Sequence, residues 1–171
     1  MIGLLANCIL KATVTVADNG ALLCGVTGCG GVFRDSSGAW KGGFAKNVGR
    51  ATAYLAELWG VYEGLCLARR QGYTNIELQV DSSVLVSGLE GVEVGNAHGR
   101  ILISRIRRLI QMNRNVRVSH VYRKANKVAD AIASLGCEMQ GFSYFDAPPT
   151  SLEQLCIDDV MGVSTPRVIF M

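Results

Sequence analysis

The stretch HVYRKANKVADAIASLG, residues 120–136, joins a strand-like run to a short helix and contains one acidic residue. Apolar and polar residues alternate across its start, as in a half-buried strand, with apolar side chains at Val116, Val118 and Val121. Basic residues follow, and an Ala-rich helix is predicted from Asn126 onward. Asp130 falls near the start of that helix, where the helix dipole favours negative charge. The stretch therefore predicts a strand–helix junction with one carboxylate beside several cations.

The rest of the chain alternates between the same two periodicities. Alternating or apolar runs predict strands over 11–17, 29–35, 39–48, 75–80 and 116–122. Spacings of three and four predict helices over 51–72, 82–91 and 98–112, besides the one opened by Asn126. The order is three strands, a helix, a strand, one or two helices, a strand and a helix. This order predicts an α/β fold, a mixed sheet with helices packed on it.

Length and composition indicate one ordered globular domain. The chain has 171 residues, of which 49% are hydrophobic and 18% charged. We expect an apolar leader over 1–10, a folded domain over 11–138 and an appended tail over 139–171 with a short helix around SLEQLC. The leader lacks the basic start and cleavage pattern of a signal peptide, and it is shorter than the roughly 20 residues that cross a bilayer. No membrane association is therefore expected. We also expect no small-molecule cofactor.

The cysteines indicate reduced thiols in an intracellular protein. The six are scattered, with no C-x-x-C pair and no nearby histidine, so a structural zinc site is not expected. The nucleus and the cytosol both fit this pattern.

Positive charge is concentrated in one window. No acidic residue occurs between Glu93 and Asp130, yet the window holds nine of the 17 basic residues: Arg100, Arg105, Arg107, Arg108, Arg114, Arg117, Arg123, Lys124 and Lys127. Such a window is typical of a surface that contacts phosphates. A solvated helix face followed by a loop explains the charge equally well.

Four acidic residues are candidates for chemistry, although each has a simpler explanation. Glu57 shares a helix strip with Ala53, Gly60 and Gly64, which indicates either a close approach or plain packing on the sheet. Asp81 closes a strand and fits a helix N-cap. Asp130 fits an ordinary surface residue near a helix start, and Asp18 fits a turn residue.

Taken together, four segments resemble the ribonuclease H domain, and most closely its plant, retroelement-derived branch described as reverse-transcriptase-like. The segments are GCGGVFRDSSGAW, AELWGVYEGLCLARRQGY, IELQVDSSVLV and VSHVYRKANKVADAIASLG, and the resemblance covers roughly residues 13–136. The pattern FDAPPTSLEQL…VMGVSTPR is similar to the C-terminal extension of that branch. The resemblance implies a five-stranded mixed sheet flanked by helices, with four carboxylates at one face.

The resemblance also implies a site and a chemistry. Carried over by motif, the catalytic and metal-binding carboxylates are Glu57, Asp81, Asp130 and a first-strand aspartate. The chain reads V-A-D-N-G-A at that strand, so either Asp18 or Asn19 takes the fourth place, and we expect Asp18. Oxygen-only ligands favour two Mg²⁺ ions, with Mn²⁺ as an alternative.

The implied partner is an RNA–DNA hybrid, recognised through its backbone and 2′-hydroxyl groups. The expected nucleic-acid-binding residues are Gly30, Gly31, Arg123, Lys124, Asn126 and Lys127. Sheet–helix packing is an equally good explanation for the two glycines.

Two functions follow from these observations. The first is a metal-dependent endonuclease that hydrolyses the RNA strand of RNA–DNA hybrids. The second is a catalytically impaired nucleic-acid-binding module with the same fold, which the irregular first strand favours. The position of Asp18 or Asn19 relative to the other carboxylates discriminates between them.

Overall fold

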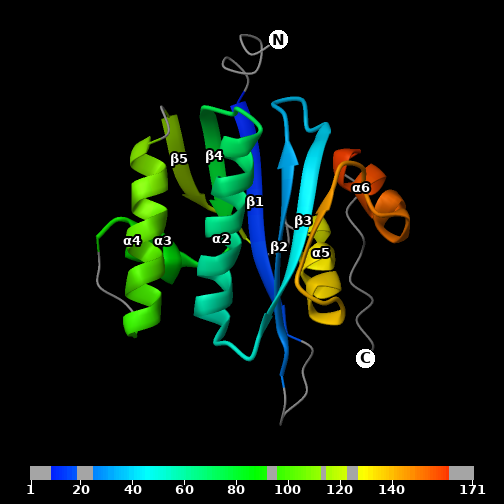
Figure 1. Ribbon diagram of the computed structural model, residues 1–171. Helices are drawn as coiled ribbons and strands as arrows, with labels where there is room; N and C mark the ends of the chain where they lie inside the picture. The colour runs from blue at the N-terminus through cyan, green and yellow to red at the C-terminus, as the bar shows by residue number, and fades with distance from the viewer. Residues whose placement is uncertain (1–8, 19–24, 92–95, 113–114, 123–126, 162–171) are drawn as a thin grey trace, which may run out of the picture.

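A six-stranded mixed sheet with helices on both faces forms the molecule (Figure 1). The computed structural model describes residues 9–18, 25–91, 96–112, 115–122 and 127–161, with the backbone alone described for 9–18. The strands are β1 (Ile9–Asp18), β2 (Thr27–Arg34), β3 (Trp40–Gly49), β4 (Asn75–Val80), β5 (Asn115–His120) and β6 (Phe142–Phe145). The first five correspond to the five predicted runs, so the expected α/β fold is confirmed.

The strands lie in the order β5-β4-β1-β2-β3-β6. Strand β1 is central: it pairs parallel to β4 and antiparallel to β2. Strand β5 adds parallel to β4, whereas β6 adds antiparallel to β3. The sheet is therefore mixed, as the order of predicted elements required.

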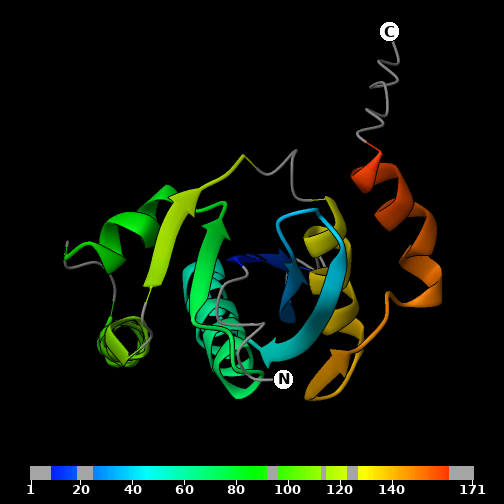
Figure 2. The ribbon, with the colours of Figure 1, turned by 90° about the horizontal axis from the view of Figure 1, so that it is seen from above.

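Helices cover the two faces of this sheet unequally (Figure 2). Helix α2 (Ala53–Arg70) lies on one face beside α4 (Ala97–Met112), with the short α3 (Ser83–Leu89) between β4 and α4. Helix α5 (Lys127–Glu138) covers β1, β2 and β3 from the other face. A 3-10 turn (Thr150–Leu152) leads into α6 (Glu153–Val160), which lies against α5. No helix in the described part of the chain has the length and apolar character needed to cross a membrane.

Each face of the sheet has its own apolar core. On the α2 face the largest fully buried side chains are Phe33, Phe44, Leu58, Leu65 and Leu78. On the α5 face the buried side chains are Val32, Ala45, Val128, Ala129 and Ile132. Burial of each of the larger of these side chains stabilises the fold by about 1.5–3 kcal/mol. The two helices are thus held on opposite faces of the sheet.

Helix α5 packs directly on the backbone of β2. A Cβ atom added to Gly30 would lie 2.7 Å from the backbone nitrogen of Ala133, and one added to Gly28 would lie 2.4 Å from the Ala133 carbonyl oxygen. From the helix side, a Cβ on Gly136 would lie 2.7 Å from the Lys46 carbonyl oxygen. Glycine at these positions is required by the close approach of helix and sheet.

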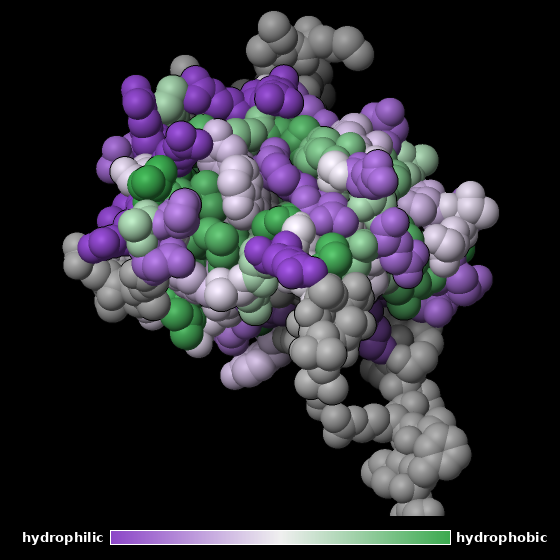
Figure 3. Space-filling model, turned by 60° about the horizontal axis from the view of Figure 1, so that its bottom comes forward, coloured by the Kyte–Doolittle hydropathy of each residue, from purple (hydrophilic) through white to green (hydrophobic). Residues whose placement is uncertain are grey.

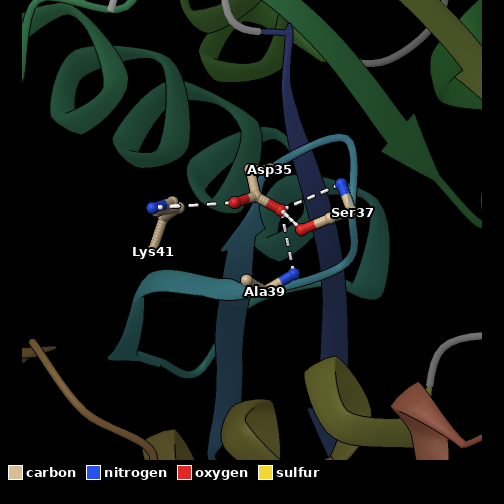
Figure 4. Close-up of polar contacts among 4 residues, drawn as sticks. All are labelled: Asp35, Ser37, Ala39 and Lys41. Atoms are coloured by element: carbon tan, nitrogen blue, oxygen red, sulfur yellow. Dashed lines mark hydrogen bonds and ion pairs between the residues drawn. The ribbon is translucent and has the colours of Figure 1, made fainter.

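The hairpin between β2 and β3 is closed by one carboxylate, as Figure 4 shows. Asp35 Oδ1 accepts hydrogen bonds from the Ser37 backbone nitrogen at 2.9 Å, the Ser37 hydroxyl at 2.6 Å and the Ala39 nitrogen at 2.9 Å. The Lys41 ammonium lies 3.6 Å from the other oxygen. These hydrogen bonds, that of the Ser37 hydroxyl first, hold the pKa of Asp35 below its usual range. The strands predicted over 29–35 and 39–48 are thus joined by a short turn that Asp35 closes.

The segment expected as an appended tail contributes to the sheet and to the core. Strand β6 pairs with β3 from Gly43 to Lys46, and the Phe142 ring stacks on Phe44 at a centroid distance of 6.0 Å. Leu155 and Cys156 of α6 pack on the α5-side core, and Asp159 pairs with Arg34 at 2.6 Å. At the other end of the chain, β1 begins within the expected leader. These differences arise because pairing with β3 is a long-range contact that local periodicity does not reveal.

Candidate active site

Glu57 lies in the second turn of α2, partly buried, at the end of the helix that adjoins α3 and α4. Its neighbour Tyr54 has a buried hydroxyl with no hydrogen-bond partner in the described part of the chain. Burial raises the pKa of that phenol, the nearby Glu57 carboxylate raises it further, and Arg107 opposes the shift. Glu57 is therefore placed at a junction of three helices and not on an open helix face.

Asp81 follows the last residue of β4 and is partly buried. It is not the N-cap of α3, although the sequence fits that role. Ser82 is the N-cap, and its hydroxyl accepts a hydrogen bond from the Leu85 backbone nitrogen at 3.2 Å. The capping explanation for Asp81 is therefore wrong, and its carboxylate is not needed to begin the helix.

Asp130 lies in the first turn of α5 and is partly buried. Its neighbours Val128, Ala129 and Ile132 face the sheet and are buried. Asp130 itself is only partly buried, so it lies outside this buried stripe. Its backbone carbonyl accepts a hydrogen bond from the Ser134 hydroxyl at 3.0 Å.

Asp18 is the last residue of β1, and its backbone pairs with Thr27 of β2. On the other side of β1, Val14 pairs with Val80, so Thr15 is the residue level with Asp81. Asp18 lies three residues further along, a distance of about 10 Å at the usual strand rise. Asn19, the alternative fourth position, lies outside the described residues.

The fit of a metal to these carboxylates is limited. Carboxylate oxygens are suitable ligands for Mg²⁺, but in the described part of the chain no three acidic, histidine or cysteine side chains gather closely enough to hold an ion. The side chain of Asp18 is not among those described. Glu57, Asp81 and Asp130 thus provide the right donor atoms without forming a metal site by themselves.

The basic window is divided over several elements. Arg100, Arg105 and Arg108 are exposed on α4, Arg117 lies on β5, and Lys127 is exposed at the start of α5. Arg107 instead turns inward, and its Nη2 donates a hydrogen bond to the Gly88 carbonyl oxygen at 2.6 Å. The predicted nucleic-acid-binding residues Arg123, Lys124 and Asn126 lie outside the described residues. The window therefore combines an exposed cationic surface with one structural arginine.

The two glycines predicted to bind nucleic acid are buried. Gly30 lies against Ala133 of α5, and Gly31 is also buried. This burial supports the packing explanation for both residues.

Sequence reasoning missed the contact between α2, α3 and α4 behind Glu57. Besides the Arg107–Gly88 hydrogen bond, a Cβ atom on Gly88 would lie 3.1 Å from the Tyr54 hydroxyl oxygen. Gly88 and Arg107 lie 19 positions apart in the chain, and no local sequence pattern indicates that they are in contact. This junction positions the end of α2 that bears Glu57.

Comparison with known proteins gives one family and several solved structures. Residues 19–136 match the protein family described as reverse transcriptase-like. An Arabidopsis thaliana protein that bears the provisional name ribonuclease H protein is 38% identical over 98% of this chain. The chain spans only 27% of the length of that relative. The family match begins at Asn19 and includes Glu57, Asp81 and Asp130.

The solved structures share the fold. RNase H1 of the archaeon Halobacterium salinarum is 27% identical, covers 76% of this chain and 98% of its own, and has a TM-score of 0.70. LC11-RNase H1 in complex with an RNA/DNA hybrid is 18% identical over 75% of this chain and 96% of its own, with a TM-score of 0.68.

Proposed function

Because the chain belongs to the reverse-transcriptase-like family of ribonuclease H domains, we propose that it is a metal-dependent endonuclease that hydrolyses the RNA strand of RNA–DNA hybrids. One observation carries the proposal: the family match covers residues 19–136 and so spans Glu57, Asp81 and Asp130, the carboxylates that the motif resemblance assigns to the site. They come from a helix, the end of a strand and the first turn of a second helix, so long-range folding is needed to use them together.

The carboxylates would act by binding cations and orienting a phosphodiester. The family typically uses Mg²⁺, and two such ions would supply a polarised water and charge neutralisation at the departing oxygen. Tyr54 and Gly88 lie close together where α2 meets α3, near Glu57, and the N-cap of α3 is Ser82, the residue after Asp81. The three described carboxylates do not form a metal site by themselves, so the fourth position on β1 decides whether the site is complete.

Basic side chains would bind the hybrid. Arg100, Arg105 and Arg108 expose cations along α4, and Lys127 does so at the start of α5. Cations on elements that flank a carboxylate site favour the phosphate backbone, whose recognition is independent of base sequence and sensitive to salt. Arg123, Lys124 and Asn126 are proposed to extend this surface.

Cleavage of a labelled RNA–DNA hybrid in Mg²⁺ or Mn²⁺ tests the proposal. We expect the RNA strand to be cut, and we expect Asp81→Asn to abolish cutting because the amide loses the negative charge that holds a cation. The matched control is Glu153→Gln, the same loss of charge on α6, which should cut like the parent. Cutting that survives Asp81→Asn would contradict the assignment of the site.

A second function is favoured by the register of β1. Since Asp18 lies about 10 Å beyond the level of Asp81, the chain also fits a binding module that has lost turnover. Hybrid binding that weakens with salt, without cleavage by the parent, would support this function. Absence of both binding and cleavage would contradict both functions.

A further inference from the structure

A groove between α2 and α4 exposes apolar surface on the outside of the molecule. Its volume is about 210 Å³, and it is lined by Leu55, Trp59, His98, Ile101, Leu102 and Arg105. Ile101 is 57% exposed although its side chain is fully apolar. In the view of Figure 3, apolar surface on the α4 side of the molecule is interrupted by hydrophilic side chains. This α2/α4 groove is thus an apolar strip with polar borders.

The polar border of the groove is basic. His98, Ile101 and Arg105 recur at spacings of three and four on α4, so they share one helix face. Arg105 is exposed, as is Arg108 one turn further. None of the residues that line the groove is acidic. A partner for this groove should therefore present apolar side chains next to negative charge.

Helix α6 presents that combination. Ile157 is 51% exposed, Val160 60% and Met161 72%. Together with Glu153 they follow the same three-and-four spacing, so one exposed stripe begins with a carboxylate and continues as apolar surface. Asp158 adds a second carboxylate beside this stripe, whereas Asp159 is paired with Arg34. We call the residues Glu153, Ile157, Val160 and Met161 the α6 stripe.

The groove and the stripe cannot meet within one molecule. Helix α4 lies at one side of the sheet, next to β4 and β5, and α6 lies at the opposite side, next to α5 (Figures 1 and 2). Both views place the width of the sheet between them. An amphipathic helix that lies in an apolar groove is a common recognition mode, but the groove must here belong to another molecule.

We propose that α6 of one copy of this chain docks in the α2/α4 groove of a second copy. The α6 stripe would place Ile157 and Val160 against Ile101 and Trp59, with Glu153 near Arg105. Such a contact is heterologous, because each copy contributes a different surface. An unused groove remains at one end of the assembly and an unused stripe at the other. The proposal does not rest on the proposed nuclease function, although Arg105 belongs to both the groove and the proposed hybrid-binding surface.

The contact should be weak. Helix α6 has eight residues and is about 12 Å long, so the buried surface falls below that of standard stable interfaces. Its charged border should make it salt-sensitive. We therefore expect self-association that increases with protein concentration and decreases with ionic strength.

Analytical ultracentrifugation of the full chain over a range of concentrations, at low and high salt, tests the proposal. Ile101→Glu blocks the groove and Ile157→Lys blocks the stripe, and each variant alone should remain monomeric where the parent associates. An equimolar mixture of the two should form dimers that do not grow, because one intact groove and one intact stripe remain. Val84→Glu, at a site 50% exposed on α3, is the matched control and should associate like the parent.

Three outcomes would overturn the proposal. Association that persists in Ile101→Glu and is abolished only by Ile157→Lys would indicate contact between two α6 helices. A parent that is monomeric at every concentration would exclude the contact. Association that occurs only after removal of residues 162–171 would indicate that these residues cover the α6 stripe within the same chain.

Discussion

At the scale of single residues, Asp81 and Ser82 are adjacent in sequence but have separate roles. Ser82→Ala removes the N-cap of α3 and should lower the free energy of unfolding by about 1 kcal/mol, a decrease of roughly 2–4 °C in Tm for a chain of this size. It should leave the RNA-cleavage rate nearly unchanged, whereas Asp81→Asn should abolish the rate with a smaller change in Tm. Thermal melts and hybrid cleavage of both variants check this. Equal effects of the two substitutions on both measurements would show that the roles are not separable.

Cys29 gives the second residue-scale prediction. Burial beneath α2 is the main cause that raises the pKa of its thiol to about 12, against an opposing effect of Lys46. The folded state therefore keeps the thiol proton that the unfolded state loses above pH 9. Because the pKa of Cys29 is higher in the folded state, the protonated thiol contributes fully to the stability of the fold below pH 9. This contribution is lost as the pH rises toward 12.

Alkylation by iodoacetamide at pH 8 measures the protection of Cys29. Mass spectrometry should find Cys29 unmodified in the native protein and modified after unfolding in urea. The exposed fraction of Cys66 and Cys156 is larger, so these two thiols serve as internal controls. Modification of Cys29 at their rate in the native protein would contradict the prediction.

At the scale of elements, the contact of α5 with β2 depends on glycine. Gly30→Ala introduces a Cβ atom 2.7 Å from the backbone of Ala133, which neither element can avoid without moving. We expect a loss of about 1–3 kcal/mol of stability, as for other overpacked sites. The matched control is Gly99→Ala on α4, where the nearest atoms are 3.6 Å away, and it should be neutral or stabilising by up to about 1 kcal/mol. Denaturant melts of both variants make the comparison.

The register of β1 against β4 gives a second prediction at this scale. Thr15 is level with Asp81, so Thr15→Asp should add a carboxylate beside the end of β4. If the parent is impaired, we expect this variant to increase hybrid cleavage by at least about tenfold, which corresponds to about 1.4 kcal/mol of activation free energy. The sequence motif instead predicts the gain for Asn19→Asp.

Cleavage rates and Mg²⁺-dependent shifts in Tm of the two variants distinguish register from motif. A gain in Asn19→Asp alone would show that the motif alignment, not the backbone register, locates the fourth carboxylate. A gain in neither variant would contradict the idea that the first strand limits activity.

Local patterns were sufficient for most elements and insufficient for their contacts. The spacing of apolar residues in 51–72 predicted a helix whose observed bounds are Ala53–Arg70, because that periodicity is a property of one segment. Asp81 and Ser82 both fit the N-cap of α3 by residue type, and the structure has Ser82 there. The burial of Gly30 depends on a helix about 100 residues later, and the register of β1 depends on β4. The sequence therefore supplies the candidate carboxylates, whereas their relative placement depends on the folded chain.

At the scale of the whole molecule, β6 and α6 are part of the folded unit. A chain that ends at Glu138 would uncover the edge of β3, the Phe44 ring and the α5-side core beneath Leu155. We expect it to melt several degrees lower or to aggregate through the unpaired edge. A chain that ends at Met161 is the control and should melt like the parent. Thermal melts and light scattering measure the difference, and a 1–138 chain as stable as the control would make the tail independent of the domain.

The strand order has a further consequence for synthesis of the protein. Strands β1, β2 and β3 are neighbours in both sequence and sheet, so they can pair as soon as they leave the ribosome. The outer edge of β3 stays unpaired from the synthesis of Gly49 until the synthesis of Phe142, the first residue of β6. At 5–20 residues per second, this interval lasts on the order of ten seconds. During that interval the nascent chain presents an open strand beside an uncovered apolar face. Translation speed and chaperone access between these two points should therefore govern the yield of native protein.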